Sequence, residues 1–416
     1  MKISIHTLGT RGDVQPYVAL ALGLKAAGHE VLMAAPAQFR HFVQNHGVGF
    51  AELPAGFLQL LEDPAFKSAM AKGLGILSIR KLLKQAKPMM AGLLDAEWAA
   101  ASQFRPDVVV HHPKALGAPR IAAHLGVSAV LASPLPGFTP TSDFPTPLLP
   151  FTNLGPFNRL SHLLTARSST LLFGGVLRSW EQATWGPGPA PTHAGKTATL
   201  YAYSPAVVPV PSEWGDDVLV SGYWFLDDAP WEPPAALAAF LAAGPPPVYV
   251  GFGSMPIPDP ALMAGIVAEA LGKTGQRAVL PSAWGGPAAG RLPDSVYLLD
   301  SAPHDRLFPL MGAVVHHGGA GTTAAALRAG KPMVICPFFG DQPFWGHRVA
   351  ALGAGPAPLA ARRLSADSLA RALHEVKNPD MRAKAQDLSA KIRKERGVEE
   401  AVAFIERQAM LTCIRQ

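Results

Sequence analysis

The stretch HHGGAGTTAAALRAGKPMVICPFFGDQ, residues 316–342, decides the fold that this sequence predicts. The apolar run Ala313–Val315 precedes it and predicts a strand. The glycines that follow lead into a helix over Thr322–Ala329, and a second apolar run covers Met333–Cys336. A strand, a glycine-rich turn, a helix and a further strand in this order are typical of a parallel sheet with helices on both faces.

The turn inside this stretch also has the chemistry of an anion-binding site. Gly318, Gly319 and Gly321 let a ligand come close to the backbone. The free N–H groups at the start of the next helix, together with its positive dipole end, attract a phosphate. The ring of His316 and the hydroxyl of Thr322 add two more donors. The alternative is that the glycines serve only the packing of a tight α/β turn.

The same alternation appears at the beginning of the chain. A strand is predicted at Ile3–Ile5, and a glycine-rich loop, Leu8–Gln15, follows it. Pro16 stands at the expected first position of a helix that ends at Gly28, and the next strand covers Val31–Ala34. The first half of the chain therefore also predicts a parallel sheet.

A break in composition divides the chain into two parts. Residues 227–247 contain six prolines, and the strand–helix alternation restarts after them. A chain of 416 residues is too long for one compact core, so we expect two doubly wound, Rossmann-like α/β domains facing each other across a cleft. The predicted ranges are 1–228 for the first domain, 229–378 for the second, and 379–416 for a helical segment that packs back across the junction.

The composition is that of a globular protein, with 49% hydrophobic and 16% charged residues. The net charge of +6 suits an anionic ligand or an anionic membrane surface, and a role in solubility alone is the alternative. No basic stretch with interleaved aromatic residues occurs, so nucleic acid is not expected as a partner. The two cysteines cannot form a disulfide framework and have no zinc-like spacing, which fits a cytoplasmic protein. The N-terminus begins directly with a strand pattern, so no signal peptide is expected, and no apolar run is long enough to span a membrane.

Two motifs together resemble those of nucleotide-sugar glycosyltransferases with the GT-B fold, the UDP-glycosyltransferase superfamily. One runs from Pro303-His304 to Asp341-Gln342, and the other is GTRGDVQP at Gly9–Pro16. The sterol glucosyltransferase and antibiotic-pathway branches are the most similar. The resemblance implies that a hexose, with glucose as first choice, passes with inversion from a UDP-sugar or dTDP-sugar to a hydroxyl of a small lipophilic acceptor. It implies no cofactor besides this donor substrate.

The resemblance also implies which residues bind the donor. All of them belong to the predicted second domain: His316, Gly318, Gly319, Gly321 and Thr322 for the diphosphate, Ser254 near the phosphates, Ser301 and His304 for the nucleobase, and Asp341 and Gln342 for the sugar hydroxyls. Plant relatives carry a ribose-binding glutamate where this chain has Ala324. Uridine and thymidine therefore remain alternatives for the nucleoside.

Asp13, in the first motif, corresponds to the base that activates the acceptor. The chemistry of transfer agrees, because the acceptor must lose a proton on one side of the cleft while a diphosphate leaves on the other. A turn-forming aspartate between Gly12 and Val14 is the alternative. Plant relatives use a histidine base here with an aspartate partner near His112, so their dyad does not carry over. No Asp-x-Asp pair occurs in the chain, and we therefore expect transfer without a metal ion.

The region 133–160 is rich in proline and aromatic residues, which suits either a linker or a rigid apolar wall. Within it, PGFTPTSDFPTPLLPF resembles the corresponding part of sterol glucosyltransferases. A sterol, triterpenoid or polyketide-like alcohol is therefore the expected acceptor. Candidate contacts with it are His112, Phe138 and Phe144.

The segment Lys67–Lys87 carries six positive charges and no acid. It predicts either a helix with one solvated face or weak, reversible contact with an anionic membrane, which would suit a lipophilic acceptor.

A different functional class, a non-catalytic GT-B partner that activates another transferase, is the alternative to an enzyme. The presence of Asp13, His316 and Asp341-Gln342 together argues against that alternative.

Overall fold

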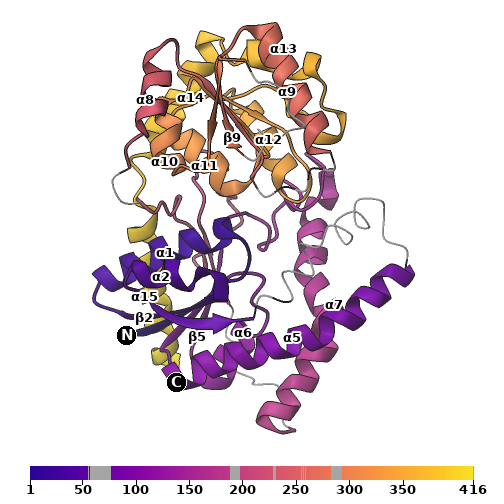
Figure 1. Cartoon of the computed structure of the whole chain (residues 1–416). Coiled ribbons are helices and arrows are strands. Elements are labelled where there is room, and N and C mark those ends of the chain that lie inside the picture. Colours follow the sequence, from indigo (N-terminus) through magenta and orange to yellow (C-terminus); the bar gives the residue numbers. More distant parts are fainter. Residues whose placement is uncertain are drawn as a thin grey trace.

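Two lobes, each built on a parallel sheet, form the body of the protein in the computed structural model (Figure 1). The structure describes residues 1–54, 56, 76–187, 197–227, 231–253, 255, 257, 259–282 and 293–415. Within these residues the N-terminal sheet has seven strands and the C-terminal sheet has five. The prediction of two doubly wound α/β domains is confirmed.

The N-terminal sheet has the strand order β3-β2-β1-β4-β5-β6-β7, and all of its neighbouring strands are parallel. Its strands are β1 (Lys2–His6), β2 (Glu30–Pro36), β3 (Gly49–Leu53), β4 (Val108–His111), β5 (Ser128–Ser133), β6 (Ala198–Tyr201) and β7 (Val218–Val220). The central strands are apolar and buried, as expected for a sheet covered on both faces. His6 pairs with His111 and His111 with Leu131, so the carboxyl ends of β1, β4 and β5 meet at one edge.

Helices cover both faces of this sheet. Helices α1 and α15 pack on one face, while α5 and α6 pack on the other, with α7 outside α5 (Figure 1). The helices of this lobe are α1 (Arg11–Ala26), α2 (Arg40–Asn45), α5 (Ile76–Phe104), α6 (Ala118–Leu125), α7 (Asn158–Trp185) and α15 (Gly397–Arg415), with short 3₁₀ turns at Ala37–Phe39 and Gly155–Phe157.

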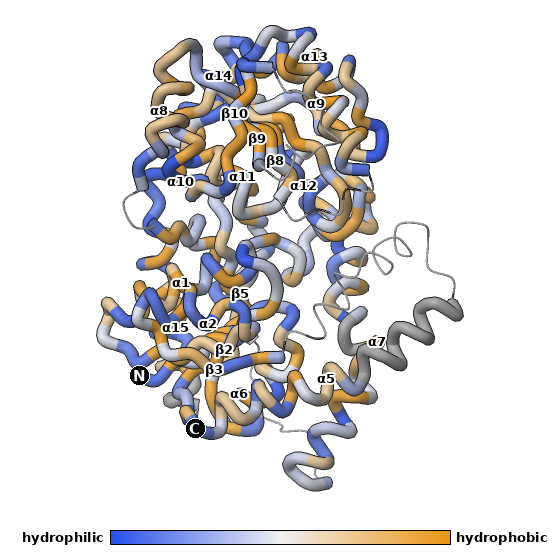
Figure 2. Tube along the Cα trace, viewed as in Figure 1, coloured by the Kyte–Doolittle hydropathy of each residue, from blue (hydrophilic) through white to orange (hydrophobic). Residues whose placement is uncertain are grey.

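The C-terminal sheet has the order β10-β9-β8-β11-β12, again with parallel neighbours. Its strands are β8 (Val248–Gly251), β9 (Ala278–Pro281), β10 (Val296–Leu299), β11 (Ala313–His316) and β12 (Met333–Ile335). Figure 2 shows the apolar character of β8, β9 and β10 inside this lobe. The carboxyl ends of β8, β11 and β12 face the N-terminal lobe, and this edge positions the donor motif.

Helices also cover both faces of the second sheet. Helices α9 and α13 pack on one face, and α8, α10, α11, α12 and α14 pack on the other. Their bounds are α8 (Ala235–Ala242), α9 (Pro260–Thr274), α10 (His304–Leu307), α11 (Ala320–Arg328), α12 (Gln342–Ala351), α13 (Ala366–Glu375) and α14 (Pro379–Ile392), with 3₁₀ turns at Phe308–Leu310 and Ala361–Arg363.

The start of α1 differs from the sequence expectation. The helix begins at Arg11, five residues before Pro16, so Asp13 lies in the first helical turn and not in a loop. The backbone N–H of Thr10, the residue before the helix, donates to Asp13 Oδ2 at 2.8 Å, and this cap fixes the early start. Pro16 therefore lies inside the helix.

The chain crosses between the lobes twice, once before α8 and once between α14 and α15. Helix α14 packs against α11 in the C-terminal lobe, whereas α15 packs against α1 in the N-terminal lobe. Phe404 and Ile405 of α15 are buried in the same apolar core as Ile3 and Ile5 of β1. The exact domain bounds given above stay a prediction. No helix in the described part of the chain is long and apolar enough to cross a membrane.

Candidate active site

A cleft of about 2620 Å³ lies between the lobes. The N-terminal lobe contributes the start of α1, the loop after β4 and the loop after β5. The C-terminal lobe contributes the loop before α10, the start of α11 and the start of α12. Of the residues selected from the sequence, the cleft is lined by Asp13, His112, Phe138, Ser301, His304, Gly319, Gly321, Thr322, Asp341 and Gln342.

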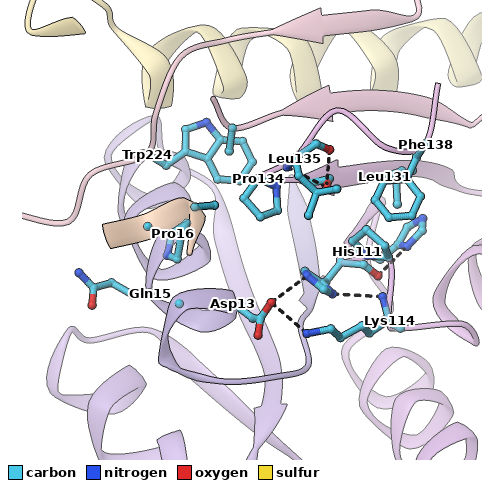
Figure 3. A pocket seen from close by; sticks show the side chains of 18 of the residues that line it. Asp13, Gln15, Pro16, His111, Lys114, Leu131, Pro134, Leu135, Phe138 and Trp224 are labelled. Carbon is cyan, nitrogen blue, oxygen red and sulfur yellow. Dashed lines mark hydrogen bonds and ion pairs between the residues drawn. The ribbon is translucent and has the colours of Figure 1, made fainter. Parts of the chain in front are cut away.

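Asp13 is the centre of a compact polar cluster on the N-terminal side. Its Oδ1 lies 3.3 Å from Nε2 of His112 and 3.1 Å from Nζ of Lys114. Its Oδ2 accepts the backbone N–H of Thr10 at 2.8 Å and the Thr10 hydroxyl at 3.2 Å. Figure 3 shows the side chains of Asp13 and Lys114 pointing toward each other.

This cluster keeps Asp13 ionised. Burial raises the pKa of its carboxyl, but the charge of Lys114 and the hydrogen bonds from His112 and Thr10 outweigh burial and hold that pKa well below its usual range. Burial also lowers the pKa of the His112 ring, so the ring is neutral. The backbone N–H of Lys114 donates to His112 Nδ1 at 3.1 Å, which places the ring proton on Nε2, toward Asp13. His112 therefore donates to Asp13.

Gly9 makes room for this carboxylate. Its φ of +139° is a conformation that side chains rarely adopt, and a Cβ there would lie 2.0 Å from Asp13 Oδ2. The glycine at the start of GTRGDVQP is thus required by the position of Asp13.

The start of α11 forms the opposite wall of the cleft. Gly319 is the residue before the helix, and Gly321 and Thr322 line the cleft in the first turn. A Cβ at Gly321 would meet nothing within 4 Å, so the backbone there is open to a ligand. The first N–H groups of a helix have no partner inside it, and they point with the positive dipole end toward the cleft. Gly318 lies behind this wall with a φ of +89°.

The structure corrects the role expected for His316. Its ring is fully buried, with Nδ1 accepting the backbone N–H of Gly318 at 3.0 Å and Nε2 3.4 Å from Met333 Sδ. His316 does not line the cleft, whereas the next residue, His317, does. The Nδ1 of His317 is buried and has no hydrogen-bond partner among the residues that the structure describes. His317 is therefore the histidine of this pair that faces the cleft.

Asp341 and Gln342 line the cleft at the start of α12. Asp341 Oδ2 accepts Nε1–H of Trp345 at 2.8 Å, and burial raises the pKa of this carboxyl. Gln342 is more occupied, because its Oε1 accepts the backbone N–H groups of Phe338 and Phe339 and its amide group faces Met255. The Asp341 carboxylate thus faces the cleft, while Gln342 holds the preceding loop.

Ser301 and His304 line the cleft near the start of α10. The His304 ring stacks on Phe308 with centroids 4.4 Å apart, and burial lowers its pKa to about 4. A flat, neutral ring in this position suits contact with a nucleobase. Ser254 and residues 67–75 of the basic segment lie outside the described residues, and of residues 76–87, which begin α5, only the backbone is described.

The three candidate acceptor contacts have different positions. Phe138 lines the cleft, and His112 lines it as the partner of Asp13. Phe144 does not: its ring packs 5.9 Å from the ring of Phe344 in the other lobe and 5.8 Å from that of His162. Phe144 is thus a packing contact between the lobes, and its expected acceptor role is corrected.

The region 133–160 forms part of the cleft wall. The backbone N–H groups of Phe138 and Thr139 donate to the hydroxyl of Tyr201, which fixes the loop after β5. The apolar lining continues along β5 through Ala129 and Leu131, and further members are Leu116, Pro119, Ala123, Leu135, Leu148, Ala166 and Leu177. The labelled members Leu131, Leu135 and Phe138 lie beside the Asp13 cluster in Figure 3.

Sequence reasoning missed two residues of this site, Lys114 and His317. Both are neighbours of residues that were selected. A histidine pair at the end of a strand and a lysine two residues after His112 were visible signals, but only the fold shows which side chain faces the cleft.

Comparisons with known proteins agree with this geometry. Residues 3–138 match the glycosyltransferase family 28 N-terminal domain, and residues 269–406 match the C-terminal domain of erythromycin biosynthesis protein CIII-like proteins. The sterol 3-beta-glucosyltransferase UGT80B1 of Arabidopsis thaliana is 37% identical over 97% of this chain and 67% of its own length. The chain belongs to the UDP-glycosyltransferase family. It is a glycosyltransferase with a GT-B fold.

Two further relatives of this glycosyltransferase are longer than it. The sterol 3-beta-glucosyltransferase UGT80A2 of Arabidopsis thaliana is 38% identical over 97% of the chain and 64% of its own length. The sterol 3-beta-glucosyltransferase of Aspergillus fumigatus is 35% identical over 98% of the chain, which spans 30% of that protein.

Solved structures share the fold at lower identity. The glycotransferase of kitacinnamycin has a TM-score of 0.71 and 20% identity, with 98% of each chain covered. The glycosyltransferase VinC, solved in complex with dTDP, has a TM-score of 0.69 and 21% identity, with 99% of this chain and all of VinC covered. These likenesses support the two-lobed fold.

Proposed function

We propose that this glycosyltransferase transfers glucose from UDP-glucose to the 3-hydroxyl of a sterol or a similar rigid, apolar alcohol. The observation that carries the proposal is the pairing of an ionised Asp13 with the open start of α11 across one cleft. The names of the relatives, sterol 3-beta-glucosyltransferases, support the choice of acceptor and sugar.

In the proposed mechanism, the acceptor oxygen attacks the anomeric carbon while its proton passes to Asp13. The bond between that carbon and the diphosphate breaks, and its electron pair leaves with the diphosphate. The N–H groups at the start of α11 and the His317 ring stabilise the leaving charge. The neutral His112 orients Asp13 through its Nε2–H, and Asp341 accepts a sugar hydroxyl. The configuration inverts because the displacement is direct.

The shape of the cleft supports a long, rigid acceptor. Its lining includes Ser128, Ala129, Leu131 and Ser133, which span β5 from end to end, and six residues of strand measure roughly 20 Å. A fused-ring alcohol has this length and can lie between β5 and α7 with its hydroxyl toward Asp13.

A product assay tests this function. The full chain is incubated with a 3β-hydroxysterol and UDP-glucose, with dTDP-glucose in parallel, and products are identified by mass spectrometry. The matched control is the same sterol with its 3-hydroxyl oxidised to a ketone. We expect one hexose added to the alcohol and none to the ketone. Donor hydrolysis without any glycosylated sterol would contradict the acceptor, and preference for dTDP-glucose would contradict the donor.

We further propose that the protein contacts an anionic membrane through α7. Three apolar side chains on one face of this helix, Leu160, Leu164 and Leu171, are 46% to 83% exposed. Phe157, the residue just before the helix, is 61% exposed. Arg167 and Arg178 are exposed at spacings that bring them near this face, and residues 76–87 of the basic segment belong to the neighbouring α5. Leu148, Thr165 and Ala166 connect the face to the cleft lining. An acceptor dissolved in lipid would thus meet the cleft directly.

Sedimentation with lipid vesicles tests this contact. The Leu164→Asp/Leu171→Asp variant should lose most binding to vesicles that contain phosphatidylserine. Leu262→Asp on α9, where Leu262 is 61% exposed like Leu164, is the matched control and should bind normally. Equal binding by all three proteins would contradict a membrane role for α7. A loss of self-association in the variant, measured by gel filtration, would assign the face to a second copy instead.

A further inference from the structure

The Asp13 carboxylate has no room for the proton that it is proposed to accept. A carboxylate offers about four lone pairs. In the structure four donors occupy them: His112 Nε2 and Lys114 Nζ at Oδ1, and the backbone N–H and hydroxyl of Thr10 at Oδ2. An acceptor hydroxyl can bond Asp13 only after one of these donors has left.

Lys114 is the donor that can leave. His112 is only 5% exposed and is fixed by the bond from the Lys114 N–H to its Nδ1. Thr10 is held by the backbone at the start of α1. Lys114, in contrast, is 43% exposed and extends into the cleft on a flexible stem. Ion pairs at such exposure are weak, so exchanging this pair for another costs little.

The cleft supplies a reason for Lys114 to move. The wall opposite carries the start of α11 and His317, which are arranged for a diphosphate. Lys114 acts electrostatically on Asp341 in that wall as well as on Asp13. A diphosphate carries more negative charge than one carboxylate, so its arrival draws the ammonium group away from Asp13.

We propose that Lys114 gates the base: it occupies Asp13 in the free enzyme and transfers to the diphosphate when the nucleotide sugar binds. The freed Oδ1 then accepts the acceptor proton, and Lys114 adds positive charge to the leaving diphosphate. Before the donor is in place, Asp13 is blocked, which prevents unproductive acceptor activation. This inference rests on the proposed function, because it uses a nucleotide sugar as the ligand.

A double-mutant cycle on nucleotide binding tests the gate without any acceptor. Calorimetry with UDP and UDP-glucose is carried out on the wild type, Asp13→Asn, Lys114→Met and the double variant. Asp13→Asn releases Lys114 in advance, so it should bind about two- to tenfold more tightly than the wild type. Lys114→Met should bind about tenfold more weakly. In the double variant the gain from Asp13→Asn should vanish.

Three results would overturn the gate. Equal affinities of the wild type and Asp13→Asn would show that Lys114 is not drawn away from Asp13. A gain that persists in the double variant would show simple repulsion between Asp13 and the nucleotide. Unchanged affinity of Lys114→Met would show that Lys114 does not reach the diphosphate. Lys114→Arg should stay close to the wild type, and Lys391→Met, at an exposed lysine of α14 outside the cleft lining, is the matched control.

Proton uptake gives a second readout that a structural role would not change. Among the groups that lower the pKa of Asp13, Lys114 has the largest effect. Its departure should therefore raise the pKa of the carboxyl, although the hydrogen bonds from His112 and Thr10 remain, and part of the carboxyl should take up a proton in acidic solution. UDP-glucose itself does not titrate there. The charged or titratable groups that face Asp13 are Tyr17 on α1, His112 and Lys114 after β4, and Asp341 before α12.

Calorimetry of UDP-glucose binding at pH 5 in buffers of different ionisation enthalpy measures this uptake. We expect more uptake by the wild type than by Asp13→Asn or Lys114→Met, because His304 and His317, which also line the cleft, contribute alike in all three proteins. Equal uptake by the wild type and Asp13→Asn would contradict the gate. If the wild type binds neither UDP-glucose nor dTDP-glucose, the proposed function fails, and that result is distinct from a failure of the gate.

Discussion

The two walls of the cleft prepare for their ligands in opposite ways. On the N-terminal wall, side chains satisfy one another, and all four lone pairs of Asp13 have donors. On the C-terminal wall, no side chain caps the start of α11, and the Nδ1 atom of His317 has no hydrogen-bond partner among the described residues. In the mechanism that we propose, the first wall loses a contact before Asp13 can act as base, and the second gains contacts when the donor binds. The difference suits an enzyme in which the donor binds first.

The largest expected effect concerns Asp13 on the N-terminal wall of the cleft. Asp13→Asn keeps the shape of the side chain but removes the proton acceptor, so kcat should fall roughly 10²- to 10⁴-fold. The measurement is steady-state turnover with the sterol acceptor. Near-normal turnover would mean that another group takes the proton and that Asp13 only caps α1.

The next largest effect concerns the C-terminal wall of the cleft. There the consecutive histidines His316 and His317 can be compared directly. His317→Ala should weaken UDP binding by about 1.5–3 kcal/mol, because a donor to a phosphate in a partly dry cleft is lost. His316→Ala should chiefly lower the free energy of unfolding, since the ring is buried against Met333. Calorimetry and thermal unfolding separate the two effects. The reverse pattern would show that His316, and not His317, contacts the diphosphate.

A smaller effect is expected for the sugar contact. Asp341→Ala should weaken UDP-glucose binding about tenfold while changing UDP binding little, because only the sugar reaches this carboxylate. Asp341→Asn keeps an acceptor for Trp345 Nε1 and controls for loss of stability. If both ligands lose affinity equally, Asp341 supports the start of α12 and does not contact the sugar.

The last prediction is that removing metal ions leaves the activity unchanged. The described residues contain no group of three or more metal-ligating side chains. The N–H groups at the start of α11 can bind a diphosphate in place of a metal ion. Activity should therefore persist in excess EDTA without added magnesium. Loss of activity in EDTA that magnesium restores would show that the N–H groups and His317 do not suffice.

Much of the fold could be predicted because its strands are short, apolar and bounded by glycine or proline. Strand β11 contains the predicted run Ala313–Val315 and one residue more, and β12 lacks only the last residue of the predicted run Met333–Cys336. The start of α1 could not be placed, since Pro16 is a strong helix-start signal and the cap by Asp13 depends on contacts with Thr10. Local sequence signals therefore predict the order of strands and helices better than they predict where a helix begins.

The site was predicted in part, for a reason that concerns side-chain direction. Motif spacing found Asp13 and Asp341, which the structure brings to one cleft. It could not tell which ring of the His316-His317 pair faces that cleft, because the strand ends between them. Phe144 was selected for its apolar ring, but that ring meets Phe344 of the other lobe, a contact between distant segments that no local pattern reveals.

The return of α15 to the N-terminal lobe has a consequence for biosynthesis. Phe404 and Ile405 fill the core beneath β1, so this lobe lacks part of its interior until the ribosome has passed residue 405. The C-terminal lobe, complete once α14 has emerged, has all of its layers earlier. The lobe that is made first is thus finished last. During synthesis the exposed face of β1 and α1 is a natural place for a chaperone to bind.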